Sequence, residues 1–234
     1  MRPGLVLLPG LLCDEALWAP QVSALSDLVD CWIPQSLSED TIPAMAKHVL
    51  RDVPFEHFAL AGLSMGGYVC MEIMRQAAHR VRALALLDTR AVADTPEETR
   101  RRHELVRLAQ TVRGFQPVTR RMLPLLIHPS RLNDIALIEI VRGMAQRTGV
   151  DAFVRQQQAI IARPDSHDVL AQVRVPSLIL CGREDALTPL VHHEEMARLI
   201  PGAELVVIDG CSHLPTLEQA DSVNQAMRRW VRRI

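Results

Sequence analysis

The sequence of 234 residues lacks several features that mark particular classes of protein. It contains no apolar stretch of the roughly 18 residues that a membrane helix needs. Its 26 basic and 27 acidic residues give a formal net charge of −1, so the overall basic field that supports non-specific nucleic-acid binding is missing. These absences argue against a membrane span and against a nucleic-acid partner.

The five cysteines show neither CxxC spacing nor a neighbouring histidine cluster, which argues against a zinc site and against a disulfide framework. The apolar run at the N-terminus is interrupted by Pro9 and Gly10 and lacks a small-residue cleavage site, unlike a signal peptide. We therefore expect a cytoplasmic protein with reduced thiols and no metal.

Short apolar runs between turn residues predict six buried parallel strands, at residues 5–8, 29–33, 58–61, 83–87, 177–181 and 204–208. Helical patterns lie between most of them, at residues 17–25, 41–53, 65–78, 192–199 and 220–234. This alternation predicts an α/β fold, in which helices cover both faces of one mostly parallel sheet.

Residues 89–174 depart from the alternation and show amphipathic helical patterns instead. One helix is expected over residues 97–112, a second from Ser130 as N-cap to Gly149 as its stop, and a third beginning at Asp151. We expect this segment to be a helical cap, inserted into a core made of residues 1–88 and 175–234. Its 14 arginines outnumber its nine acidic residues by five.

The segment Gly62-Leu63-Ser64-Met65-Gly66 stands between an expected strand and an expected helix. G-x-S-x-G in this context forms a sharp turn that exposes a nucleophilic serine, and glycine leaves room for the elements that pack against the turn. Ser64 is therefore the candidate nucleophile. The alternative is a turn serine in a dinucleotide-binding crossover, but Ser64 occupies the position of the second glycine in G-x-G-x-x-G.

A serine nucleophile needs a base, and the base needs an acid that orients it. In this arrangement the acid follows the serine in the chain and the histidine comes last. Asp185 and His213 stand after the fifth and sixth expected strands and are the candidates for these roles. Asp88, after the fourth strand, is an alternative acid. Cys211 is an alternative nucleophile, although it stands on no such turn.

Three motifs therefore follow one another in order: G-x-S-x-G, then G-x-x-D with a proline-containing turn, then G-x-x-H. On these motifs the chain resembles the α/β-hydrolase superfamily from Leu5 to Trp230. The resemblance implies a triad of Ser64, His213 and Asp185, acyl-transfer chemistry, and a six-stranded sheet in the order 2-1-3-4-5-6.

The same resemblance implies an oxyanion hole made by the backbone N–H groups of Leu11 and Met65. Leu11 belongs to the segment Pro9-Gly10-Leu11-Leu12, which corresponds to His-Gly-x-x in the family. Pro9 replaces a histidine that orders this loop, so the departure concerns loop geometry rather than chemistry. The candidate substrate-binding residues are Leu12, Arg90 and Arg163.

The resemblance is strongest to small carboxylesterases, including those that act on pimeloyl-type methyl esters of acyl carriers. It implies hydrolysis of a small-molecule ester or thioester, an acyl carrier protein as a potential partner, and no cofactor. Two alternatives use the same fold: a lyase or C–C hydrolase with the same Ser–His pair, and a non-catalytic ligand-binding protein. The basic cap either attracts an anionic partner or simply presents solvated helix faces.

Overall fold

A six-stranded sheet occupies the centre of the computed structural model, which describes residues 2–112, 114, 116, 118 and 122–234. All five strand pairs are parallel, and the order β2-β1-β3-β4-β5-β6 confirms the prediction. The strands are β1 (Gly4–Leu8), β2 (Asp30–Trp32), β3 (Phe58–Leu63), β4 (Val81–Leu87), β5 (Ser177–Gly182) and β6 (Glu204–Ile208).

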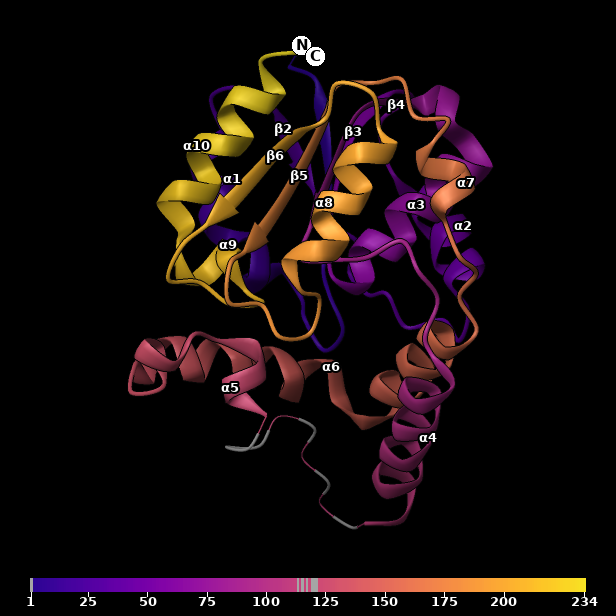
Figure 1. Ribbon diagram of the computed structural model, residues 1–234, viewed down its shortest axis with the longest axis vertical. Helices are drawn as coiled ribbons and strands as arrows, with labels where there is room; N and C mark the ends of the chain where they lie inside the picture. The colour runs from indigo at the N-terminus through magenta and orange to yellow at the C-terminus, as the bar shows by residue number, and fades with distance from the viewer. Residues whose placement is uncertain (1, 113, 115, 117, 119–121) are drawn as a thin grey trace.

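Helices cover both faces of the sheet, which explains why its central strands are apolar on both sides (Figure 1). One face packs against α2 (Ile42–Asp52), α3 (Met65–Ala77) and α8 (Leu190–Leu199), and the other against α1 (Ala19–Leu25) and α10 (Ala220–Val231). In β1, the side chains of Val6 and Leu8 belong to the hydrophobic core on the first of these faces, and those of Leu5 and Leu7 belong to the core on the second. A short helix, α9 (Pro215–Glu218), precedes α10.

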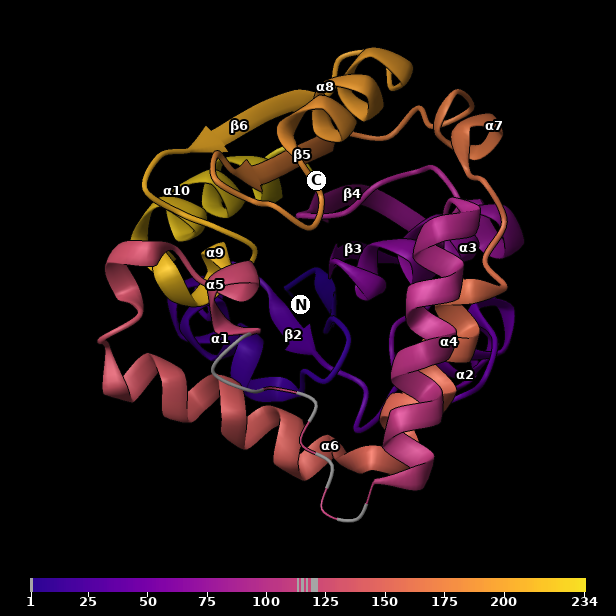
Figure 2. The same ribbon diagram turned by 60° about the horizontal axis from the view of Figure 1, so that its bottom comes forward.

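Between β4 and β5, the described residues form helices and no strand. These helices are α4 (Pro96–Thr111), α5 (Leu123–Leu126), α6 (Ile135–Ile161) and α7 (His167–Leu170). The first three lie beyond the edge at which the strands end, and Figure 2 shows them arranged around that edge. We call α4, α5 and α6 the cap helices. None of the described helices has both the length and the apolar composition required to cross a membrane.

The longest helix, α6, spans the two helices expected here but begins at a different residue. It begins after Asp134, whose side chain accepts a hydrogen bond from the Leu137 N–H, so Asp134 rather than Ser130 is the N-cap. Ser130 instead hydrogen-bonds to the ring of His128. The expected break at Gly149 is confirmed, because α6 consists of two helical segments that meet at this glycine. With φ 80° and ψ 168°, Gly149 kinks α6 between two helical segments.

We predict that Gly149→Ala lowers the free energy of unfolding by about 1–3 kcal/mol, because its backbone conformation is open essentially to glycine alone. No atom lies within 4 Å of the position that an added Cβ would take, so the loss reflects the backbone and not a clash. Gly143→Ala is the matched control, because Gly143 lies in the helical part of α6, where alanine is favoured by about 0.5–1 kcal/mol. Urea denaturation measures both changes, and equal effects would contradict this account of the kink.

Candidate active site

Ser64 occupies a strained turn between β3 and α3. Its φ of 55° and ψ of −116° are rare for a residue other than glycine. Two hydrogen bonds to the neighbouring end of β4 hold the turn: the Ser64 N–H donates to the Leu87 carbonyl at 3.0 Å, and Thr89 Oγ1 donates to the Ser64 carbonyl at 2.8 Å. The fold therefore fixes the direction in which the serine hydroxyl leaves the backbone.

The glycines on either side of Ser64 stand where a side chain has no room. A Cβ added to Gly66 would lie 2.2 Å from the Leu8 carbonyl oxygen, and one added to Gly62 would lie 2.4 Å from the Gly66 backbone. Both obstacles are backbone atoms of elements that pack together, so neither can move aside as a flexible side chain would. The turn requires glycine at both positions, as expected from the motif.

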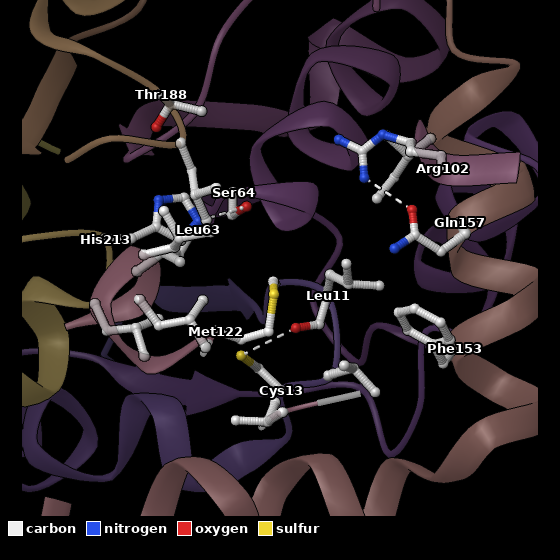
Figure 3. A pocket seen from close by; sticks show the side chains of 18 of the residues that line it. Leu11, Cys13, Leu63, Ser64, Arg102, Met122, Phe153, Gln157, Thr188 and His213 are labelled. Atoms are coloured by element: carbon white, nitrogen blue, oxygen red, sulfur yellow. Dashed lines mark hydrogen bonds between the residues drawn. The ribbon is translucent and has the colours of Figure 1, made fainter. Parts of the chain in front are cut away.

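Ser64, His213 and Asp185 come together at the carboxyl ends of β3, β6 and β5. The Oγ atom of Ser64 lies 3.0 Å from Nε2 of His213, and Nδ1 of His213 lies 2.8 Å from Oδ2 of Asp185 (Figure 3). Asp185 also accepts a hydrogen bond from Thr188 Oγ1 at 2.5 Å. Burial opposes its ionisation, but His213 and Thr188 outweigh burial and hold the pKa of Asp185 well below its ordinary value.

Asp88, the alternative acid, bonds to the backbone rather than to the histidine. Its Oδ1 accepts from the Gly182 N–H at 2.9 Å, and its Oδ2 is buried without a hydrogen-bond partner in the described part of the chain. Burial and the nearby Asp185 carboxylate raise the pKa of Asp88 well above its ordinary value, which favours the neutral carboxyl. Asp88, Asp185 and His213 place potential metal ligands within 4.8 Å of one another, but Asp185 and His213 Nδ1 already bond to each other.

The Cys211 thiol is poorly suited to act as a nucleophile. The residue is fully buried, and burial raises the pKa of its thiol well above the ordinary value. A nucleophilic cysteine must reach the thiolate form, which this environment disfavours. The position of Cys211 therefore supports Ser64 as the candidate nucleophile.

The loop after β1 approaches the candidate nucleophile closely. A Cβ added to Gly10 would lie 3.3 Å from the Ser64 Cβ, so this loop packs against the turn that carries Ser64. Neither the Leu11 N–H nor the Met65 N–H donates to an acceptor among the described residues. An oxyanion hole needs two N–H donors of this kind, so Leu11 and Met65 remain its predicted donors.

A glutamine from the cap helices holds the conformation of this loop. Leu12 adopts a φ of 61°, and its N–H donates to Oε1 of Gln156 at 3.1 Å. The Gln156 amide is buried, and its Nε2 donates to the Leu37 carbonyl at 2.6 Å. A side chain from α6 thus holds this loop, in which Pro9 stands where the family has a histidine.

A cavity of about 390 Å³ opens in front of Ser64 and His213, between the cap helices and the sheet (Figure 3). Most of its lining is apolar and comes from the cap helices and the loop after β1. Leu12 and Arg90, both expected to bind substrate, contribute to the lining, whereas Arg163 does not. The polar lining residues include Arg90, Glu98, Arg101, Arg102, Gln157 and Thr188.

Arg90 and Arg163 converge on Asp94, whose side chain is only 1% exposed. Arg90 lies 2.7 Å from Asp94 Oδ1 and 2.7 Å from Glu98, and Arg163 lies 2.7 Å from the same Oδ1. The Arg163 guanidinium also stacks on the Tyr68 ring, 4.2 Å from its centroid. Arg163 therefore anchors the segment that follows α6 to α3, and it lies outside the cavity wall.

Sequence reasoning did not identify Asp94, Gln156 or Gln157 as residues of the site. The sequence does contain a signal for Gln157. It follows Phe153 by four residues and precedes Ile160 by three, so it lies on the apolar stripe expected for this helix. Phe153, Gln157 and Ile160 line the cavity, whereas Asp94 and Gln156 act from behind its wall. A polar residue within an apolar stripe is a candidate for a specific contact.

Comparisons with known proteins identify the family to which this chain belongs. The chain is 28% identical over 246 residues to a pimeloyl-[acyl-carrier protein] methyl ester esterase from Xanthomonas campestris, covering 98% of this chain and 95% of that protein. It is 29% identical over 205 residues to the dihydrolipoyllysine-residue acetyltransferase component of the acetoin cleaving system of Pseudomonas putida, covering 83% of this chain but only 50% of that relative.

Among solved structures, a thermophilic esterase from Thermogutta terrifontis matches with a TM-score of 0.86 and 31% identity, covering 99% of this chain and 90% of that one. The sequence profile of the Alpha/beta hydrolase family matches residues 5–226, which is nearly the whole chain. The resemblance seen in the three motifs is thus confirmed over the whole fold. The protein belongs to the alpha/beta hydrolase family.

Proposed function

We propose that this protein hydrolyses a carboxylic ester or thioester through an acyl-enzyme formed on Ser64. Its family and its esterase relatives support a hydrolase activity. The observation that carries the proposal is the hydrogen-bonded series from Ser64 Oγ through His213 to Asp185, with distances of 3.0 and 2.8 Å, beside a largely apolar cavity.

Acylation follows from the order of these contacts. His213 Nε2 takes the hydroxyl proton as Ser64 Oγ attacks the carbonyl carbon, and the Asp185 carboxylate stabilises the resulting imidazolium. The carbonyl oxygen becomes negative and accepts hydrogen bonds from the Leu11 and Met65 N–H groups. His213 then gives its proton to the departing alcohol or thiol, which leaves the acyl group on Ser64.

Deacylation repeats these steps with water in place of the hydroxyl. His213 removes a proton from the water as its oxygen attacks the acyl carbon, and the proton then returns to Ser64 Oγ as the carboxylic acid departs. The apolar lining suits an acyl chain. The name of the Xanthomonas relative suggests an acyl carrier protein as the macromolecule that could present such an ester.

We predict that Ser64→Ala loses about 10⁴-fold or more of the activity on short p-nitrophenyl esters, because the variant cannot form the covalent intermediate. Release of p-nitrophenol measures the rate. Ser130→Ala, at an exposed serine beside the cap helices, serves as the control and retains full activity. Turnover by the Ser64 variant at a rate near that of the parent would exclude this serine as the nucleophile.

We predict that Asp185→Asn lowers kcat by about 10⁴-fold, because the amide would favour the wrong tautomer of His213 and remove the charge that balances its imidazolium. Asp88→Asn is the matched variant and costs about tenfold or less. Asparagine resembles the neutral carboxyl that burial favours at this position and can still accept from the Gly182 N–H. The opposite ranking in steady-state kinetics would assign the orienting acid to the end of β4.

A further inference from the structure

Gln157 presents an unused hydrogen-bond donor to the cavity. The residue is only 1% exposed, and its Oε1 accepts a hydrogen bond from Arg102 Nη1 at 2.8 Å. A guanidinium offers donors only, so this bond determines which end of the amide faces Arg102. The Gln157 Nε2 consequently faces the cavity, as Figure 3 shows, and it has no acceptor within the part of the chain that the structure describes.

Arg102 is itself held in place and has a donor to spare. Its Nε donates to Oδ2 of the buried Asp94 at 2.6 Å, and its Nη1 holds Gln157. Its Nη2 bonds to no acceptor among the described residues. Two N–H donors from fixed side chains thus line one part of the cavity, and fixing them beforehand reduces the entropy that a ligand must overcome.

The charges around these donors favour an anion. The guanidinium groups of Arg90, Arg102 and Arg163 surround the carboxylates of Asp94 and Glu98, which leaves one positive charge in excess. Partial burial opposes ionisation of Glu98, but hydrogen bonds and the charge of Arg90 lower its pKa to about 2. Burial likewise opposes ionisation of Asp94, and Arg102 and Arg163 lower its pKa. Both carboxylates are therefore charged near neutral pH, and the excess remains.

The position of Arg102 bears on the two alternatives for the basic cap, which includes the consecutive residues Arg100, Arg101 and Arg102. Arg100 is exposed, and Arg101, at the rim of the cavity, is paired with the exposed Glu97 at 2.5 Å, which balances its charge. Of the three consecutive arginines, Arg102 alone joins the buried cluster and the cavity donors described above. The relevant positive charge thus lies inside the site and not on the surface of the cap helices.

We propose that the ester hydrolysed by this protein carries a carboxylate, bound by Gln157 Nε2 and Arg102, with an apolar segment between the carboxylate and the scissile ester. One carboxylate oxygen accepts from each donor, and charge-assisted hydrogen bonds of this kind are about twice as strong as neutral ones. This inference rests on the proposed function and adds a substrate class, which is either the half-esters of dicarboxylic acids or the esters of hydroxy acids.

Two pairs of esters test the substrate class. Monomethyl adipate against methyl hexanoate places the carboxylate on the acyl side, and 4-acetoxybutanoate against butyl acetate places it on the alcohol side. We expect kcat/KM to be about 10- to 100-fold higher for the charged member of one pair at low ionic strength. The pair that shows the preference identifies which side of the ester the donors bind.

Variants at neighbouring glutamines test the site. Gln157→Leu removes the donor, and the ratio of the two kcat/KM values falls toward one. Gln157→Glu places a second carboxylate at the same position and reverses the preference. Gln158→Leu is the matched control, because Gln158 is the exposed neighbour on α6, and it leaves the ratio unchanged. An inactive fraction lowers both kcat/KM values equally, so partial misfolding does not alter the ratio.

The outcomes separate this inference from the proposed function. Efficient hydrolysis without a preference in either pair would overturn the carboxylate site and leave the esterase proposal intact. A preference of undiminished size in Gln157→Leu would also overturn the site, because Arg102 alone would then account for it. Failure on all four esters, while p-nitrophenyl acetate is hydrolysed, would overturn the inference alone. Failure on p-nitrophenyl acetate as well would overturn both.

Discussion

The close packing of the Ser64 turn against β1 is the constraint on which the site depends. Gly66 lies so near the Leu8 carbonyl that no side chain fits between them. The same turn is bonded to the end of β4 through Leu87 and Thr89, so three adjacent strands define the position of the serine hydroxyl. Its strained backbone persists because the surrounding sheet determines it.

Buried polar contacts link the cap helices to this core. Gln156 holds the loop that carries one expected oxyanion donor, and Asp94 gathers arginines from both ends of the insertion. Such buried ion pairs contribute little net stability, because desolvation offsets their attraction. Their effect here is geometric, since they orient Arg102 and, through it, the amide of Gln157. The cap helices thereby shape the cavity as well as cover it.

The parts of the fold and site that the sequence predicts are those with local signals. Apolar runs mark the strands, and the motifs around Ser64, Asp185 and His213 each follow one strand, so the parallel order alone brings them to one edge. The Arg102–Gln157 pair has no such signal, because its members are 55 residues apart on two helices whose packing no local pattern reveals. Gly149 does carry a local signal, and α6 is interrupted at this residue as the sequence predicts.

We propose that Ser64, with the Leu11 and Met65 N–H groups, forms one acyl-transfer site. A crystal structure of the protein inhibited by a p-nitrophenyl phosphonate tests it most directly, because the adduct mimics the tetrahedral intermediate. We expect phosphorus bonded to Ser64 Oγ, with a phosphoryl oxygen about 2.7–3.1 Å from both backbone nitrogens. An adduct on another residue, or a phosphoryl oxygen that faces away from both N–H groups, would contradict it.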